Sequence, residues 1–86
     1  MKLHIIVIRD SGADCYSQPQ FVASIGAFVR GFGDSVKNKS PENQLSQHPA
    51  DFEAFHIGTY DDADAGFEIF PVEKSICRGA DYVVQS

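Results

Sequence analysis

The sequence predicts an α+β fold: a single small domain, residues 1–86, of β-α-β-β order with one amphipathic helix packed on a small, mostly antiparallel sheet. Three observations support this prediction. An apolar run opens the chain, an apolar stripe with helical spacing follows, and two strand-like segments then flank an Asp-rich turn. A chain of 86 residues has room for only one core.

The first predicted strand is LHIIVI, residues 3–8. Both of its alternating faces are apolar, which is typical of a central strand covered on both sides. One helix can cover only one side, so the other needs the C-terminal residues or a second copy of the chain. We expect a homodimer, because a chain of this length has a small core and exposed sheet edges. Residues 9–20 are rich in Ser, Gly, Asp and Pro and are predicted to be a loop.

The predicted helix has the clearest pattern in the chain. Ser24 stands at the position expected for its N-cap. Glycines within the helix each cost about 1 kcal/mol relative to alanine, so packing rather than propensity must hold it. Its apolar stripe consists of Ile25, Phe28, Val29, Phe32 and Val36.

A polar loop and a β-hairpin are predicted after the helix. The loop covers residues 38–50, and Pro49 suits the start of a short helical turn. Residues 53–60 and 66–72 have the character of two paired strands. Gly66 ends the turn between them and is predicted to take its positive φ.

The C-terminal residues are harder to place. We expect the ordered core to span about residues 2–72. Residues 73–86 form a tail with one more apolar group, Tyr82-Val83-Val84, which either covers a sheet face or adds a short strand.

Charge and cysteine content limit the classes of function. A formal net charge of −5 opposes non-specific attraction to nucleic acid, so any such contact is expected on a local basic surface. The opening apolar run is too short for a signal peptide or a membrane span. Cys15 and Cys77 are far apart, and we expect an intracellular protein with reduced thiols.

Residues 46–66 concentrate histidines and aspartates and raise the question of a metal site. Asp61, Asp62 and Asp64 fit no EF-hand register, because the glycine and the carboxylates fall at the wrong positions. His48 and His56 match no zinc spacing. We therefore interpret the aspartates as turn formers and expect neither a metal nor a cofactor.

Enzymatic chemistry is also disfavoured. Cys15 is a candidate nucleophile, with His4 or His56 as its base, but nothing in the sequence brings these residues together. No glycine-rich segment has the spacing of a phosphate-binding loop. We expect a protein that has no catalytic residues and no small-molecule substrate.

The candidate binding residues lie on the helix, opposite its apolar stripe. Gly26, Arg30, Gly33 and Lys37 recur at intervals of four, three and four residues, and Lys39 follows the helix. Glycine allows a partner to approach closely, and Arg and Lys bind phosphates. This face is predicted to bind nucleic acid or protein. The alternative is an ordinary solvated face.

The order of short motifs along the chain resembles a known family. The motifs are IRDS at residues 8–11, Y-x-QP-x-F (Tyr16, Gln18, Pro19, Phe21), G-x-x-x-R-x-F-x-D (Gly26, Arg30, Phe32, Asp34), HP-x-DF (His48, Pro49, Asp51, Phe52) and IG-x-YDD…G (Ile57, Gly58, Tyr60, Asp61, Asp62, Gly66). Over about residues 3–72 this succession is similar to the small nonstructural protein of gokushoviruses, the Microviridae subgroup of single-stranded DNA bacteriophages.

The resemblance implies a nonvirion protein in the cytoplasm of an infected bacterium. Such proteins are often labelled DNA-binding, with a part in genome replication, and the family supplies no catalytic residues. We therefore expect a binding protein whose partner is single-stranded DNA or the replication machinery. The alternative is a protein-interaction module that binds or inhibits a host factor, with its acidic surface as a mimic of DNA.

Overall fold

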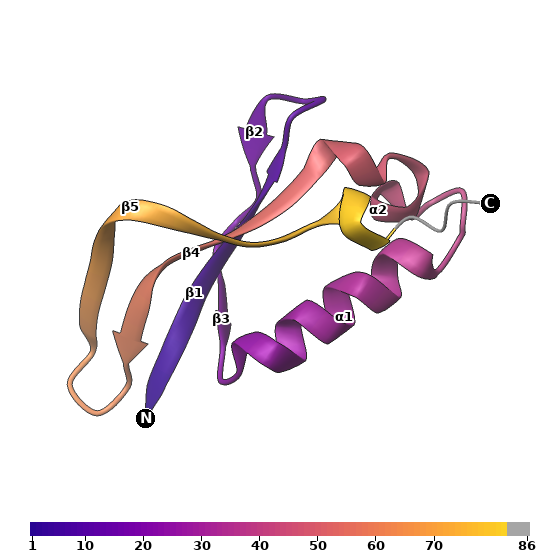
Figure 1. Cartoon of the computed structure of the whole chain (residues 1–86). Coiled ribbons are helices and arrows are strands. Elements are labelled where there is room, and N and C mark those ends of the chain that lie inside the picture. The colour runs from indigo at the N-terminus through magenta and orange to yellow at the C-terminus, as the bar shows by residue number, and fades with distance from the viewer. Residues whose placement is uncertain (83–86) are drawn as a thin grey trace.

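The computed structural model describes residues 1–82 and confirms the predicted α+β class (Figure 1). The sheet has five strands and α1 is the main helix. In chain order the elements are β1 (Lys2–Asp10), β2 (Cys15–Tyr16), β3 (Gln20–Val22), α1 (Ile25–Lys37), α2 (Gln44–Gln47), the 3-10 turn η1 (Pro49–Asp51), β4 (Phe52–Asp61), β5 (Gly66–Arg78) and the 3-10 turn η2 (Gly79–Tyr82).

β1 is the central strand of the sheet, and every pairing is antiparallel. On one side it pairs with β4 along its whole length, from Lys2 opposite Asp61 to Asp10 opposite Phe52. On its other side it pairs with β3 near its start and with β2 at its end. Within residues 1–82 β5 pairs with β4 alone and forms an edge. The predicted loop over residues 9–20 is therefore wrong in part, because the chain turns back and pairs with β1 twice.

The two faces of the sheet are covered differently. On one face Ile6, Ala54 and Cys77 are buried together with Phe32 and Val36 of α1. We call this the helix side, because α2 and η2 also contribute their apolar side chains to it. The opposite face, which we call the open face, carries alternate residues of β1 and their partners. In Figure 1 the β4–β5 hairpin projects away from α1, so one end of the sheet extends beyond the helix.

α1 begins and ends at side-chain caps. The Ser24 hydroxyl accepts a hydrogen bond from the Ala27 N–H at 3.2 Å, as its predicted N-cap role requires. At the other end the Asn43 amide donates to the carbonyl oxygens of Ser35 at 2.7 Å and Asn38 at 2.9 Å. These bonds satisfy carbonyls that the end of a helix leaves unpaired. They also tie the predicted loop to α1.

The fold continues past residue 72, where the ordered core was predicted to end. β5 runs on to Arg78, and η2 then places the Tyr82 ring edge-on against Phe32, with ring centroids 6.0 Å apart. Residues 73–78 therefore extend the sheet, and η2 packs against α1 on the helix side. Val83 and Val84, the rest of the predicted apolar group, lie outside the described residues.

The hairpin turn differs from the prediction in one residue. Ala65, not Gly66, takes the positive φ, at 57°. Gly66 is already paired with Asp61 as the first residue of β5, and its N–H donates to the Asp64 carboxylate at 2.9 Å. The Asp61 carboxylate accepts from the Ala63 N–H at 3.0 Å in the same way. The aspartates are turn formers, as predicted.

Replacing Ala65 by glycine should relieve this strained backbone. Alanine in the left-handed conformation costs about 1–2 kcal/mol, and glycine removes this cost. Glycine also gives the unfolded chain more conformational freedom, which lowers stability by about 0.4–1 kcal/mol. We expect Ala65→Gly to be neutral or to stabilise the protein by up to about 1 kcal/mol in urea unfolding. Ala63→Gly, in the same turn, should lower stability. Destabilisation by both variants to the same extent would contradict the assigned turn geometry.

Two glycines of α1 should respond oppositely to the same substitution. A Cβ on Gly33 would lie 2.6 Å from Cε1 of Tyr82, whereas a Cβ on Gly31 would meet nothing within 4 Å. We expect Gly31→Ala to stabilise the protein by up to about 1 kcal/mol through helix propensity. Gly33→Ala should destabilise it by about 1–3 kcal/mol through overpacking. Urea unfolding measures both, and a stabilising Gly33→Ala would refute the packing of Tyr82 on α1.

Candidate functional site

One side of α1 carries the predicted basic residues. Gly26, Arg30 and Lys37 are all exposed there, and so is Lys39 beyond the helix. Asp34 lies among them but is not within ion-pair distance of any of them. Within residues 1–82, Arg30, Lys37 and Lys39 have no carboxylate partner. We call these three cations the basic side of α1.

Three of the four remaining cations have other contacts, whereas Lys2 is exposed and forms no ion pair within residues 1–82. Arg9 forms an ion pair with Asp14 at 2.7 Å, and Arg78 approaches Asp81 at 3.5 Å. The contact with Asp14 raises the pKa of Arg9. Lys74 lies over the Phe70 ring, 4.7 Å from its centroid. The basic side of α1 therefore groups three cations that are free of such contacts with carboxylates.

Gly33 does not belong to this exposed side. It is buried, and Tyr82 packs directly over it. The prediction that Gly33 lies on an accessible binding face is therefore wrong. Its lack of a side chain makes room for η2. Lys37 borders the same contact, with its Nζ 5.9 Å from the Tyr82 ring centroid.

The open face of the sheet exposes a cluster that the sequence analysis did not identify. We call it the apolar patch: Leu3, Phe21, Tyr60, Phe67 and Ile69. The ring centroids of Tyr60 and Phe67 are 4.8 Å apart, and those of Phe21 and Tyr60 are 5.7 Å apart. Phe67 is 62% exposed and Ile69 is 60% exposed. Four patch residues and Ala65 line an open hollow of about 510 Å³.

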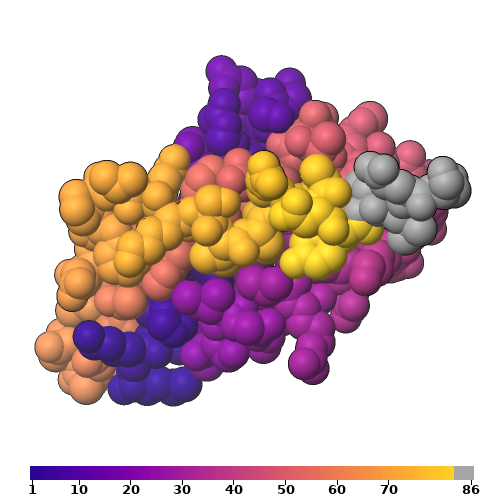
Figure 2. Space-filling view, in the orientation of Figure 1, coloured from indigo at the N-terminus to yellow at the C-terminus, as the bar shows by residue number. Residues whose placement is uncertain are grey.

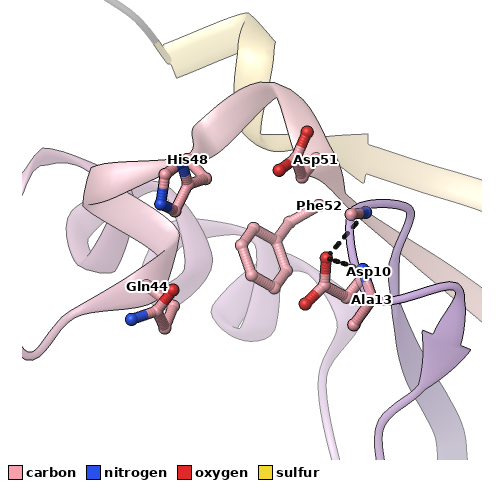
Figure 3. Close-up of a pocket in the computed structure, with 7 residues that line it drawn as sticks. Asp10, Ala13, Gln44, His48, Asp51 and Phe52 are labelled. Carbon is pink, nitrogen blue, oxygen red and sulfur yellow. Dashed lines mark hydrogen bonds between the residues drawn. The ribbon is translucent and has the colours of Figure 1, made fainter.

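A smaller hollow of about 210 Å³ lies between the β1–β2 loop and the α2–η1 segment (Figure 3). The Asp10 carboxylate accepts from the N–H groups of Gly12 at 3.0 Å and Ala13 at 3.2 Å. In Figure 3 the Phe52 ring lies between Asp10 and His48. These bonds close the β1–β2 loop on itself. The Ser11 N–H donates to the Asp51 carbonyl oxygen at 2.8 Å and joins the two segments, so the IRDS and HP-x-DF motifs meet at this point.

His4 and His56 are brought together on the helix side. The His4 Nδ1 and the His56 Nε2 are 3.3 Å apart, within hydrogen-bond distance. The Phe70 ring packs edge-on against His56, with centroids 4.8 Å apart. Burial lowers the pKa of His56, and the neighbouring His4 lowers it further. Because the two histidines come from different strands, sequence spacing gave no sign of this contact.

The Asp-rich turn is tied to the start of the chain. The N-terminal amine lies 2.8 Å from the Asp62 carboxylate and 3.5 Å from that of Asp61. The hydrogen bond from the Ala63 N–H is the main reason that the pKa of Asp61 is lowered. Asp61 and Asp62, two of the aspartates that suggested a metal site, thus interact with the N-terminal amine.

The candidate nucleophile is not brought together with its two candidate bases in the described structure. Cys15 is exposed at the end of the sheet, whereas the His4–His56 pair lies on the helix side. Within the same residues no three His, Cys, Asp or Glu side chains are placed to hold a metal ion. None of the helices described is long and apolar enough to cross a membrane.

Comparison with known proteins gives one match. A family model described as Phage ORF5 protein matches residues 3–82. The chain belongs to this phage protein family. No curated protein and no solved structure matches it significantly.

The extent of the match agrees with the fold of this phage protein. It runs from the start of β1 through η2, whereas the resemblance in the sequence reached only about residue 72. Residues 73–82, which the sequence analysis placed outside the ordered core, therefore belong to the region that the family model matches. The phage origin is established, and the narrower assignment to gokushoviruses remains a prediction.

The stability of this phage protein should decrease when the medium becomes mildly acidic. The pKa of His56 is lowered from 6.5 in the fold, so the unfolded chain binds more protons than the folded one once the pH falls below that value. This contribution to stability is present above pH 6.5 and is lost as the pH falls through the folded-state pKa. We expect urea unfolding of the wild type to show this loss between about pH 7.5 and pH 5.5.

The matched variants for this experiment are His56→Gln and His48→Gln, since His48 is exposed. His56→Gln should flatten the pH dependence, whatever its effect on absolute stability, and His48→Gln should leave it as in the wild type. An unchanged slope in His56→Gln would refute this role for the buried histidine.

Proposed function

We propose that this phage protein is a nonstructural protein that binds single-stranded DNA during genome replication, in the cytoplasm of the infected bacterium, through the basic side of α1. The observation that carries the proposal is the set of three exposed cations, Arg30, Lys37 and Lys39, without carboxylate partners in the described structure. The chain has a net charge of −5, but these three cations have no carboxylate partner and are therefore available to phosphates.

The helix is well placed for this role. Its apolar stripe is fixed in the core through Phe32 and Val36, so the basic side can bind without disturbing the packing. Gly26 is exposed in the first turn of the helix and leaves the backbone accessible. Repulsion from the acidic remainder of the protein would confine DNA to this side. About three phosphate contacts to a single strand predict a log–log salt slope near −2.

A second candidate function is a protein-interaction module that binds a host factor. The apolar patch favours it, because a surface of exposed aromatic and aliphatic side chains is typical of protein contacts. The Asp61–Asp64 turn gives weaker support to the idea that the protein mimics DNA. The N-terminal amine lies beside Asp61 and Asp62 and neutralises part of their negative charge. In both versions we propose a binding protein without catalytic activity, cofactor or small-molecule substrate.

A titration with fluorescently labelled oligo-dT tests the proposal. We expect the Kd of the wild type to rise steeply as salt increases from about 20 to about 150 mM, because counterions compete for the phosphates. Arg30→Glu combined with Lys37→Glu should weaken binding at least about tenfold at low salt and reduce the salt slope.

The matched control is Lys74→Glu, which reverses an exposed lysine on β5 outside the helix. It should change the Kd by no more than about twofold. Absence of wild-type binding at low salt, or an equal loss in the control, would reject DNA as the ligand of α1. A host protein retained by the wild type when DNA is absent would then favour the second function.

A further inference from the structure

We infer that two copies of the chain associate face to face through the apolar patch on the open side of the sheet. This inference does not depend on DNA binding, because the patch and the basic side of α1 are separate surfaces. The patch is the part of the sheet that the helices leave uncovered: α1, α2 and η2 contribute their apolar side chains to the opposite face.

The chain has more surface than a compact monomer of its size. Its accessible surface is 5609 Å², whereas a monomer of 9.4 kDa is expected to expose about 5,000 Å². Its radius of gyration is 13.7 Å, compared with about 12 Å expected for 86 residues. Two copies that each buried this excess of about 600 Å² would form an interface of about 1,200 Å² in total, at the lower limit of the standard size.

The chemistry of the patch selects an apolar partner. None of its five side chains is charged, and Phe21, Phe67 and Ile69 are each at least 46% exposed. A nucleic acid would require cations beside the aromatic rings. The N-terminal amine near the patch is held by Asp61 and Asp62, and strand alternation places Lys2 on the opposite face from Leu3. The space-filling view shows the β4–β5 hairpin and the start of β1 together at one end of the molecule (Figure 2).

A second copy meets these requirements without further assumptions. A two-fold contact places the same surface on both sides, and an uncharged centre avoids direct contact between like charges of two acidic chains. Two sheet faces pack at about 10 Å with their side chains interleaved, and the hollow beside Tyr60 and Phe67 offers room for protruding side chains of the partner.

The edge strand β5 favours face-to-face packing over sheet extension. Pro71 interrupts its row of backbone donors, and Glu68, Glu73 and Lys74 are exposed along it. Such residues discourage pairing with the edge of another sheet. Packing through the open face therefore closes the assembly at two copies and leaves both α1 helices on the outside.

Sedimentation equilibrium without DNA tests the inference. The wild type should have an apparent mass near twice 9.4 kDa. Phe67→Lys and, separately, Ile69→Lys should reduce it to that of one chain, because each places an uncompensated charge at the contact. Both side chains are at least 60% exposed, and far-UV circular dichroism verifies that the variants remain folded. The melting temperature of the wild type should also rise with protein concentration.

Ala27→Lys adds the same charge to an exposed position of α1 and should leave the dimer intact. A monomeric wild type at about 100 μM would overturn the inference, as would a dimer that survives both patch variants. A dimer that forms only in the presence of DNA would also overturn it. The same holds for a monomeric wild type that binds a host protein in stoichiometric amount and no longer binds it after Phe67→Lys. Arg30→Glu with Lys37→Glu should leave the dimer unchanged, so failure of DNA binding and failure of dimerisation are distinguishable.

Discussion

The burial of Ile6 between the sheet and α1 is the interaction on which both layers of the protein depend. Ile6 is fully buried and lies among Phe32, Val36, Ala54 and Cys77. Burying a side chain of this size stabilises a fold by about 1.5–3 kcal/mol, a large share for so short a chain. Burial also raises the pKa of Cys77 to about 11, so its thiol stays protonated and serves as an apolar group.

Because the core lies on one side of the sheet, the outer side of α1 and the open face of the sheet differ in chemical character. α1 buries its apolar stripe and turns Arg30 and Lys37 outward, while the open face retains exposed aromatic rings. One surface is suited to phosphates and the other to apolar side chains. Under the two proposals, one small domain carries two separate binding surfaces, and charge on one does not have to be desolvated for contact at the other.

The features that the sequence predicted correctly are local ones. The stripe and cap of α1 lie within a few residues of one another, and the β4–β5 hairpin joins adjacent segments. β2 and β3 were missed because strands of two or three residues have no periodicity to detect. The pairing of β4 with β5 is irregular on both sides of His56, which interrupts the alternation of side chains between the two faces. The full length of β5 was missed for this reason.

The candidate site was predicted only in part for the same physical reason. Arg30 and Lys37 follow from helical spacing, but the burial of Gly33 depends on Tyr82, which is distant in the sequence. The apolar patch depends on pairing between strands, since Tyr60 faces both Leu3 and Phe67. Alternation within GFEIF placed Phe67 and Ile69 on one face, which was the available signal for this surface.

The pairing of β1 with β4 also determines when the fold can form during synthesis. β1 is made first, but its only full-length partner begins at Phe52, after α1 and the following loop. Until β4 leaves the ribosome, the segment LHIIVI lacks its main partner strand and its apolar side chains stay accessible to chaperones and to other nascent chains. Folding is therefore a late event for this chain, completed when the β4–β5 hairpin and η2 close over α1.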